Sequence, residues 1–317
     1  SPFPPLDLMV HIGEISAASF NDTIPAKEVW RVSEDGELRD PFKKLTTVFQ
    51  MSEEMFFLHY GKDGCNRHVL IDECRELFGE IYEQIPELPF CNIWTAMQLS
   101  SRLPKGALFH MGVSNTRRCW NMFQLPESVE SACNVGCCGI DGCVSTLVGA
   151  SLVNPDRLCY VVVGDLTFFY DLNSLGNHHI GTNLRVMLVN NGRGTEFRLG
   201  IHHCNVFGDD ADKYMAAAGH FGNKSPLLVK HYAEDLGFHY LSATTKEEFM
   251  TALSNFTNPQ LSDHSMILEV FTDSKDESEA LYLMSHIQSD AKGMVRSKLK
   301  DAVRNECSVK GEALYKT

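Results

Sequence analysis

Two polar positions follow two apolar segments in the middle of the chain. Asp165 comes just after the apolar run 160–163, and Asn191 comes just after the apolar run 184–189. Unbroken apolar runs this short are typical of parallel strands that are buried on both faces. In an open parallel sheet, ligands bind just beyond the carboxyl ends of the strands. We therefore expect Asp165 and Asn191 to lie together at one edge of a sheet.

The residue types around these positions suit a metal-bound phosphate. A carboxylate and an amide oxygen are hard ligands of the kind that Mg²⁺ takes. A helix predicted over 167–175 follows Gly164, Asp165 and Leu166, so its free N–H groups and the Thr167 hydroxyl could meet a phosphate. An isolated Gly-Asp is more often a helix cap, and an asparagine pair is more often a turn. Their occurrence at the ends of two consecutive strands favours a Mg²⁺-diphosphate site instead.

A glycine-rich loop, GCCGIDG over 136–142, precedes a predicted helix that begins at Cys143. On its own, this glycine spacing is weak evidence for phosphate binding and often marks only a tight turn. Beside the Asp165 motif, the loop becomes a second candidate for the phosphate site.

These motifs resemble those of thiamine diphosphate-dependent enzymes, in which Gly-Asp is followed at a similar interval by Asn-Asn. The stretches MGVSNTRR, CGIDGCVSTLVGA and GDLTFFYDLNSLG are most similar to one branch of the family. That branch makes SEPHCHC from isochorismate and 2-oxoglutarate in menaquinone biosynthesis. The resemblance covers roughly residues 7–275 and is most specific in the central hundred residues.

The resemblance implies two cofactors, thiamine diphosphate and Mg²⁺. It assigns the metal to Asp165, to Asn191 and to the backbone oxygen of Arg193. It assigns Ile140 to the support of the bent, V-shaped form of the cofactor, and an ordinary core residue is the less favoured alternative. It places the diphosphate and its surroundings at five residues: Gly139, Asp141, Gly164, Leu166 and Thr167.

The resemblance also implies a substrate site with Ser114, Arg118 and Phe197. An arginine fork suits a carboxylate. Two residues depart from the family pattern, because Val135 stands where the family has a substrate-binding arginine and Glu196 stands where it has an aliphatic residue. A site with one arginine fewer and one carboxylate more is expected to bind a dianionic substrate less well. A thiamine diphosphate enzyme that decarboxylates a different 2-oxoacid is therefore an alternative.

The resemblance implies a transferase or lyase that acts on carbon–carbon bonds: a 2-oxoacid loses CO₂ and the remaining unit is protonated or joined to an acceptor. In the family, the pyrimidine ring of the cofactor is activated by a glutamate of an amino-terminal domain, usually from another subunit. No stretch of this chain resembles that domain. We therefore expect a carboxyl-terminal part of a longer protein, or a subunit that needs another chain, inactive alone and in a homo-oligomer. A non-catalytic assembly module and a nucleotide-binding flavodoxin-like or Rossmann domain are the alternatives.

Composition narrows the class of protein. The 317 residues are 44% hydrophobic, which is enough for a core, and carry a formal net charge of −13. This charge disfavours nucleic acid or an anionic membrane as the main partner. The 11 cysteines contain no pair of CxxC motifs, so we expect reduced thiols, no zinc site and a cytoplasmic protein. We expect neither a signal peptide nor a membrane-spanning helix.

The order of the predicted elements indicates an α/β fold, with a doubly wound parallel sheet preceded by part of a second α/β domain. We predict the end of that first domain and a linker over 1–85, the diphosphate-binding domain over 86–275, and a charged helical tail over 276–317. The predicted strands are 6–12, 29–32, 107–111, 130–133, 158–163, 184–189, 238–241 and 265–271. The predicted helices are 52–58, 66–84, 91–101, 116–123, 143–152, 167–175, 224–236 and 246–256, with a helical tail over 274–310.

Overall fold

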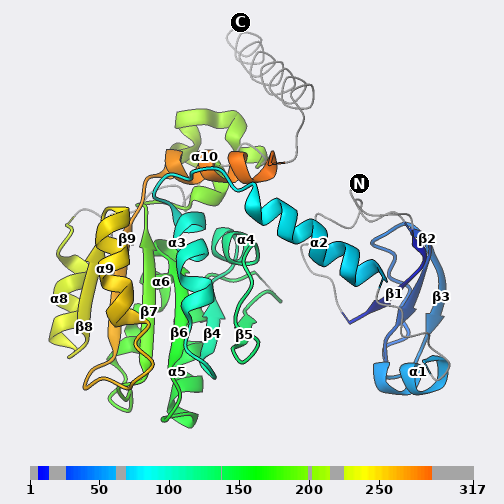
Figure 1. The fold of residues 1–317 in the computed structure, drawn as a ribbon, viewed down its shortest axis with the longest axis horizontal. Helices are drawn as coiled ribbons and strands as arrows, with labels where there is room; N and C mark the ends of the chain where they lie inside the picture. Colours follow the sequence, from blue (N-terminus) through cyan, green and yellow to red (C-terminus); the bar gives the residue numbers. More distant parts are fainter. Residues whose placement is uncertain are drawn as a thin grey trace, which may run out of the picture. The chain divides into compact units, whose positions relative to one another are not determined.

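The computed structural model describes residues 6–13, 26–61, 69–136, 138–198, 202–214 and 225–287. The chain divides into two compact units, Ser1–Leu77 and Phe78–Thr317. The helix α2 (Val69–Glu83) runs across the boundary between them (Figure 1). Each unit is described by itself.

The smaller unit is a three-stranded parallel sheet with one helix. It contains β1 (Leu6–Ile12), β2 (Ala26–Val32), β3 (Leu45–Phe49) and α1 (Glu53–Tyr60), and the strand order is β1-β2-β3. The first two strands agree with the prediction, and β3 has no predicted counterpart. The buried Phe56 of α1 packs against Phe49 of β3, with ring centroids 5.0 Å apart. This aromatic contact helps to hold the helix on the sheet.

The larger unit contains a six-stranded sheet in which every pair of neighbours is parallel. Its strands are β4 (Leu108–Met111), β5 (Glu130–Cys133), β6 (Cys159–Gly164), β7 (Leu184–Asn190), β8 (His239–Ala243) and β9 (Met266–Phe271). Their order is β5-β4-β6-β7-β9-β8. All six agree with predicted strands to within two residues at either end.

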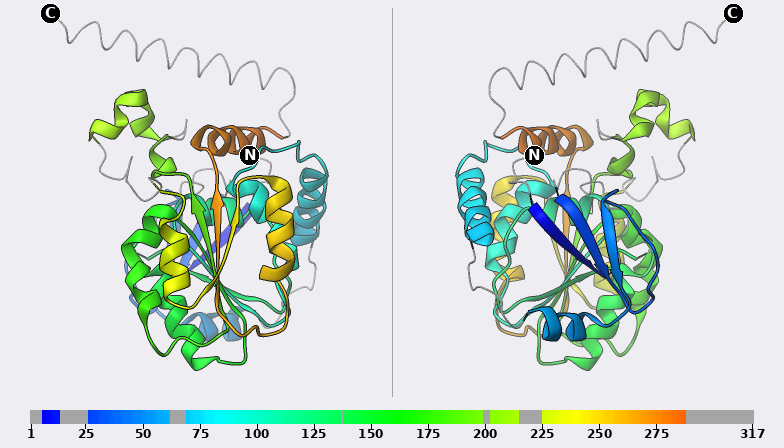
Figure 2. Two further views of the ribbon diagram at one scale, coloured as in Figure 1. Left: turned by 90° about the vertical axis from the view of Figure 1, so that its left-hand side faces the viewer. Right: turned by 90° about the vertical axis from the view of Figure 1, so that its right-hand side faces the viewer.

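Helices cover both faces of this sheet (Figure 2). One face carries α3 (Asn92–Leu99), α4 (Asn115–Trp120) and α9 (Lys246–Phe256). The helix α10 (Ser274–Ser285) lies beyond the carboxyl ends of the strands and packs on the same core (Figure 2). The other face carries α5 (Cys143–Val153), α6 (Asp165–Asp171) and α8 (Leu228–Asp235). The central strand β6 supplies Tyr160 and Val162 to the first core and Val161 and Val163 to the second. This alternation explains the unbroken apolar run, and the predicted doubly wound α/β fold is confirmed.

The strand order reverses between β4 and β6. The chain leaves β4 for β5 on one side and returns to β6 on the other side of β4. Such a reversal opens a crevice at the carboxyl ends of the two strands, where ligands bind in folds of this kind. The connections after β4, β6 and β7 therefore form the expected site.

Short helical turns complete the larger unit. They are η2 (Ser100–Arg102), η3 (Leu172–Gly176), η4 (Thr195–Arg198), η5 (His203–Asp210) and α7 (Ala211–Tyr214). The first two continue predicted helices, whereas the others have no predicted counterpart. The beginning of the predicted helix 224–236 and the end of the tail beyond residue 287 lie partly outside the described residues.

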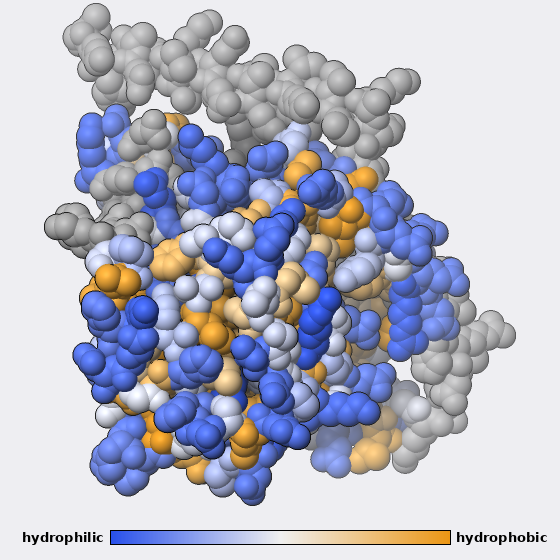
Figure 3. Space-filling model, turned by 60° about the vertical axis from the view of Figure 1, so that its left-hand side comes forward, coloured by the Kyte–Doolittle hydropathy of each residue, from blue (hydrophilic) through white to orange (hydrophobic). Residues whose placement is uncertain are grey.

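The helix α10 packs on the core of its own unit. Ala280 is fully buried there, and Leu281 and Met284 are partly buried against the same core. Over the described ranges, no helix has the length and apolar character needed to cross a bilayer. Mostly polar side chains cover the side of the molecule that carries α8 and α9 (Figure 3), with apolar ones scattered among them. The eight described cysteines are free thiols.

Candidate functional site

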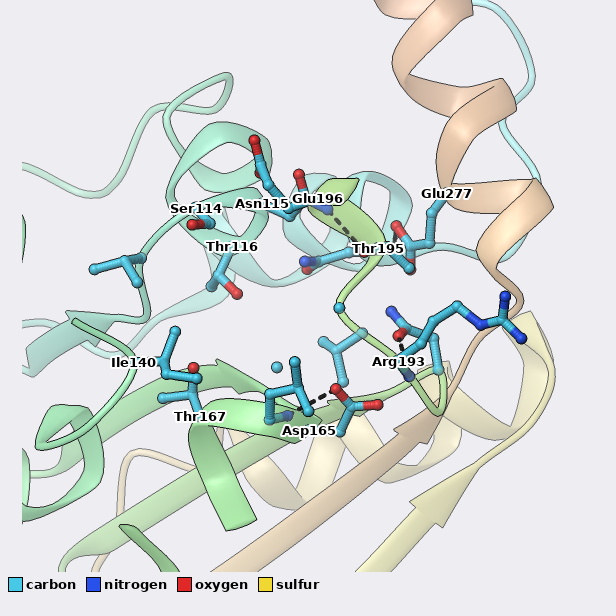
Figure 4. A pocket seen from close by; sticks show the side chains of 17 residues that line it. Ser114, Asn115, Thr116, Ile140, Asp165, Thr167, Arg193, Thr195, Glu196 and Glu277 are labelled. Carbon is cyan, nitrogen blue, oxygen red and sulfur yellow. Dashed lines mark hydrogen bonds between the residues drawn. The ribbon is translucent and has the colours of Figure 1, made fainter. Parts of the chain in front are cut away.

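A cavity of about 150 Å³ lies at the carboxyl ends of β4, β6 and β7 (Figure 4). We call its two parts the floor and the rim. The floor is formed by the residues that follow β6 and β7: Gly164, Asp165, Leu166, Thr167, Asn191 and Arg193. The rim is formed by residues from α4, η4, α3 and α10 and from the segments beside them: Asn92, Ser114, Asn115, Thr116, Thr195, Glu196 and Glu277.

Asp165 is fixed by backbone donors from both strand ends. Its Oδ1 accepts the N–H of Leu166 at 2.7 Å, and its Oδ2 accepts the N–H of Gly192 at 2.6 Å. Gly192 has φ +81°, a left-handed conformation that favours glycine and aims its N–H at the carboxylate. The Asp165 carboxylate therefore joins the ends of β6 and β7.

The two consecutive asparagines point to different environments. Asn191 lines the cavity, and its Oδ1 accepts the N–H of Arg193 at 3.4 Å. Asn190 is buried in the sheet and donates its side-chain N–H to Glu269 at 2.7 Å. The other oxygen of Glu269 accepts the Tyr240 hydroxyl at 2.7 Å, and burial raises the pKa of this carboxyl. Alternation along the strand thus leaves only Asn191 at the cavity.

The glycine-rich loop contributes one residue to the cavity. Ile140 lines it beside Thr167, as Figure 4 shows. Gly139 and Asp141 flank Ile140 but are not among the described residues that line the cavity, and Asp141 is exposed. Cys137 of this loop lies outside the described residues.

Ser114 connects β4 to α4 in an uncommon backbone conformation. Its φ of +57° and ψ of −122° lie in a region that non-glycine residues rarely adopt. Such strain persists where surrounding structure imposes it, and it occurs often at functional sites. Ser114 lines the cavity next to Asn115, whose side-chain N–H donates to the Thr195 hydroxyl at 2.7 Å.

Arg118 and Glu196 form a two-pronged ion pair. Arg118 Nη1 lies 2.8 Å from one carboxylate oxygen of Glu196, and Nη2 lies 3.0 Å from the other. Hydrogen bonding to Glu196 raises the pKa of Arg118. Of the described side chains, Glu196 lines the cavity but Arg118 does not, and the side chain of Phe197 lies outside the described residues. Sequence reasoning singled out both charges but did not pair them.

Glu277 is a lining residue that sequence reasoning missed. It is 6% exposed and accepts the backbone N–H of Asn92 at 3.0 and 3.1 Å and the Thr272 hydroxyl at 2.6 Å. Burial raises the pKa of its carboxyl to about 7. It lies in the stretch predicted to be a charged tail, so the sequence held no signal that it faces a cavity.

The donor set of the floor suits a hard cation. Within the described ranges, no group of three or more His, Cys, Asp and Glu side chains could hold a metal. A metal at Asp165 would therefore need amide and backbone oxygens, which Asn191 and the turn to Arg193 place on the same cavity. Oxygen ligands of this kind fit Mg²⁺ better than a softer metal.

No protein-family model matches the chain. Among curated proteins, it is 33% identical over 263 residues to 2-succinyl-5-enolpyruvyl-6-hydroxy-3-cyclohexene-1-carboxylate synthase (SEPHCHC synthase) of Bacteroides fragilis. It is 32% identical over 265 residues to the protein of the same name from Phocaeicola vulgatus. Each match covers 81% of the chain. The chain is a homologue of SEPHCHC synthases.

The similarity covers only part of these synthases. The matches take in 45% of the Bacteroides fragilis protein and 44% of the Phocaeicola vulgatus protein. A third SEPHCHC synthase, from Christiangramia forsetii, is 33% identical over 199 residues, which are 63% of the chain and 33% of that protein. The predicted resemblance to this family is confirmed, and the chain spans about half the length of the curated relatives it matches.

Proposed function

We propose that this chain is the cofactor-binding, carboxyl-terminal part of a thiamine diphosphate- and Mg²⁺-dependent enzyme that resembles SEPHCHC synthase and acts on a 2-oxoacid. One observation carries the proposal. Asp165, Asn191 and Ile140 come from three separate segments and line one cavity at the reversal of strand order. The homology to SEPHCHC synthases supports the same conclusion.

In this proposal, Mg²⁺ is held by Asp165, by Asn191 Oδ1 and by the backbone oxygen of Arg193. Each oxygen of the Asp165 carboxylate accepts a backbone N–H, and a carboxylate oxygen can accept a hydrogen bond and bind a metal at the same time. The two N–H groups hold the carboxylate in place before the metal arrives. Such preorganisation lowers the cost of binding.

We assign the cofactor diphosphate to the floor beside this metal. Gly164, Leu166 and Thr167 line the cavity there, and Thr167 adds a hydroxyl. Gly139 and Asp141 belong to the same proposed site, on either side of Ile140. With a net charge of −13, the chain would neutralise a diphosphate through the metal and backbone N–H groups rather than through a basic patch.

Thiamine diphosphate would supply the electron sink that decarboxylation of a 2-oxoacid requires. The chain's own residues would orient the reactants. The aliphatic side chain of Ile140 would support the cofactor, and Ser114, Arg118 and Phe197 would shape the substrate end. Because residues of α3, α4, η4 and α10 and of the segments after β6 and β7 line the cavity, it would also limit the access of water to the reacting atoms.

The remaining part of the site would come from another domain. We propose an amino-terminal, pyrimidine-binding domain, supplied within a homo-oligomer, as the partner that completes the enzyme. The chain alone should therefore turn over no 2-oxoacid, and CO₂ release by the purified chain would contradict this part of the proposal.

The deciding experiment is a calorimetric titration of the chain with thiamine diphosphate, with and without Mg²⁺. We expect binding that requires Mg²⁺ and that disappears in Asp165→Ala. The matched control is Asp156→Ala, which removes an exposed carboxylate near the opposite end of β6. This control should bind as the unmodified chain does.

If the chain alone shows no binding, the titration is repeated with the amino-terminal half of a homologous synthase added. Binding that returns, and that still requires Asp165, supports a site divided between two domains. Absence of binding under both conditions contradicts the assignment of the floor. Mg²⁺-dependent binding without turnover in the completed assembly would support a non-catalytic assembly module.

An ion pair at the rim supports a second candidate function. The Arg118–Glu196 ion pair favours a thiamine diphosphate-dependent decarboxylase or carboligase whose substrates differ from those of the SEPHCHC synthases. Comparing turnover of several 2-oxoacids by the completed assembly would separate the two functions.

A further inference from the structure

The guanidinium group of Arg118 already holds a carboxylate. Its two terminal nitrogens each donate to a different oxygen of Glu196, at 2.8 and 3.0 Å, and Nη1 also donates to Asn115 Oδ1 at 2.5 Å. Parallel N–H···O bonds of this kind are the geometry with which arginine binds carboxylates in general. A ligand carboxylate would need the same two donors.

Glu196 lies between the cavity and Arg118. Its side chain lines the cavity, whereas Arg118 is not among the lining residues in the described part of the chain. The two side chains are 23% and 32% exposed, so the pair is only partly open to solvent. Figure 4 shows Glu196 beside Asn115, in the rim. A ligand that enters the cavity therefore meets the carboxylate of Glu196 before the guanidinium.

The pair is held from both sides. Asn115 contacts Arg118 through its oxygen and Thr195 through its nitrogen. Three side-chain hydrogen bonds join α4 to η4, one from Asn115 to Thr195 and two from Arg118 to Glu196. Glu196 could leave Arg118 only if this linkage were rearranged. Release would also place its charge in a cavity that Asp165 already lines. A carboxylate ligand would thus meet both competition and repulsion between like charges.

We propose that Glu196 permanently occupies the carboxylate-binding fork of Arg118 and makes this end of the cavity selective for an uncharged polar group. Four lining side chains there are neutral hydrogen-bonding groups: Ser114, Asn115, Thr116 and Thr195. They suit the carbonyl or hydroxyl of a neutral acceptor. The substrate class of the site would then be a neutral acceptor, and its role in catalysis rests on the proposed function.

The test uses succinate as a dicarboxylate probe, titrated into the chain and followed by NMR of the arginine side-chain N–H groups. We expect no saturable binding to the unmodified chain. Glu196→Gln keeps the size of the side chain but removes its charge, so Arg118 becomes available. Affinity for succinate should then rise at least about tenfold, because charge-assisted hydrogen bonds contribute ~1.5–3 kcal/mol.

Two variants make the result specific. Adding Arg118→Gln to Glu196→Gln should abolish the gained binding. The matched control is Glu130→Gln, which breaks a second arginine–glutamate pair, with Arg157 at 2.9 Å, away from the cavity. It should gain no affinity for succinate. Glu196→Ser serves as a second test variant, and thermal unfolding confirms that each variant is folded.

Saturable, Arg118-dependent binding of succinate to the unmodified chain would overturn the proposal. Folded Glu196→Gln and Glu196→Ser variants that both fail to gain affinity would overturn it as well. Titration of the same variants with Mg²⁺ and thiamine diphosphate separates the two inferences. Gained succinate binding in variants that bind no cofactor, either alone or with the amino-terminal half of a homologous synthase added, would leave the role of Glu196 intact and contradict the proposed function.

Discussion

The floor and the rim of the cavity hold their polar groups by different means. On the floor, Asp165 and Asn191 accept backbone N–H groups from the segments that follow β6 and β7. On the rim, the charges of Arg118 and Glu196 are paired with each other. The floor therefore presents oxygen atoms to a ligand, whereas the rim has satisfied most of its charge internally.

This difference indicates where binding energy and selectivity arise. A carboxylate that is already held in place can bind a cation at a lower cost. An arginine that already holds a carboxylate contributes little to the binding of another one. We infer that the floor binds the common cofactor and that the rim distinguishes among substrates.

The largest effect that we expect from the rim is a dependence of the stability of the fold on pH, and Glu277 is its cause. Burial raises the pKa of its carboxyl from the ordinary value of 4.5 to about 7, so folding favours the protonated form. Stability is therefore greatest below pH 4.5 and is lost as pH rises through 7, by on the order of 3 kcal/mol. Glu277→Gln should remove this loss, as measured by urea unfolding at pH 5 and pH 8.

The matched control is Glu279→Gln, which changes an exposed glutamate of the same helix. Its stability should follow the same pH profile as that of the unmodified chain. An equal pH profile for Glu277→Gln and the unmodified chain would show that Glu277 is not a buried carboxyl in solution.

Asn190 and Asn191 are adjacent in the sequence but should respond differently to substitution. Asn190→Ala removes a donor from the buried Glu269 carboxylate and should lower the free energy of unfolding by about 2 kcal/mol. Asn191→Ala changes a side chain at the cavity and should alter stability by less than about 0.5 kcal/mol. Mg²⁺-dependent binding of thiamine diphosphate should show the reverse order, with the greater loss in Asn191→Ala. Equal effects of the two variants on the free energy of unfolding and on cofactor binding would contradict the separation between a buried Asn190 and a cavity-lining Asn191.

The smallest effect that we expect concerns the side-chain contacts of Asn115, which help to join α4 to η4 in the rim. Asn115→Ala removes the contacts to Thr195 and Arg118 and should lower the free energy of unfolding by about 1 kcal/mol. It should also loosen Glu196, so succinate should bind slightly better than to the unmodified chain. Asn121→Ala, at the other end of α4, changes an exposed side chain and should do neither.

The sequence predicted the floor because strand ends fix it. Buried parallel strands are recognisable as short apolar runs, and the residue after each run must lie at the same edge of the sheet. Both Asp165 and Asn191 therefore became candidates without any knowledge of contacts. For the same reason, all six strands of the larger unit were predicted to within two residues at either end.

The rim could not be predicted in this way because it depends on contacts between distant segments. Arg118 and Glu196 are 78 residues apart, and Glu277 and Asn92 are 185 residues apart. Glu277 lies on a helix with the composition of a solvated tail, and nothing in its immediate sequence indicates burial. The strand β3 was missed for a local reason, since its five residues include two threonines and are too few to show a period.

The contact between Glu277 and Asn92 has a consequence for protein engineering. It brings the last described helix of the larger unit against the beginning of α3, although the two lie at opposite ends of that unit's sequence. Units whose ends lie close together tolerate circular permutation. A permuted chain could join the end of α10 to the segment before α3 with a short linker and open new termini in the exposed connection between α9 and β9, around Gln260. Such a chain would keep the floor and the rim while separating this unit from every other part of the protein.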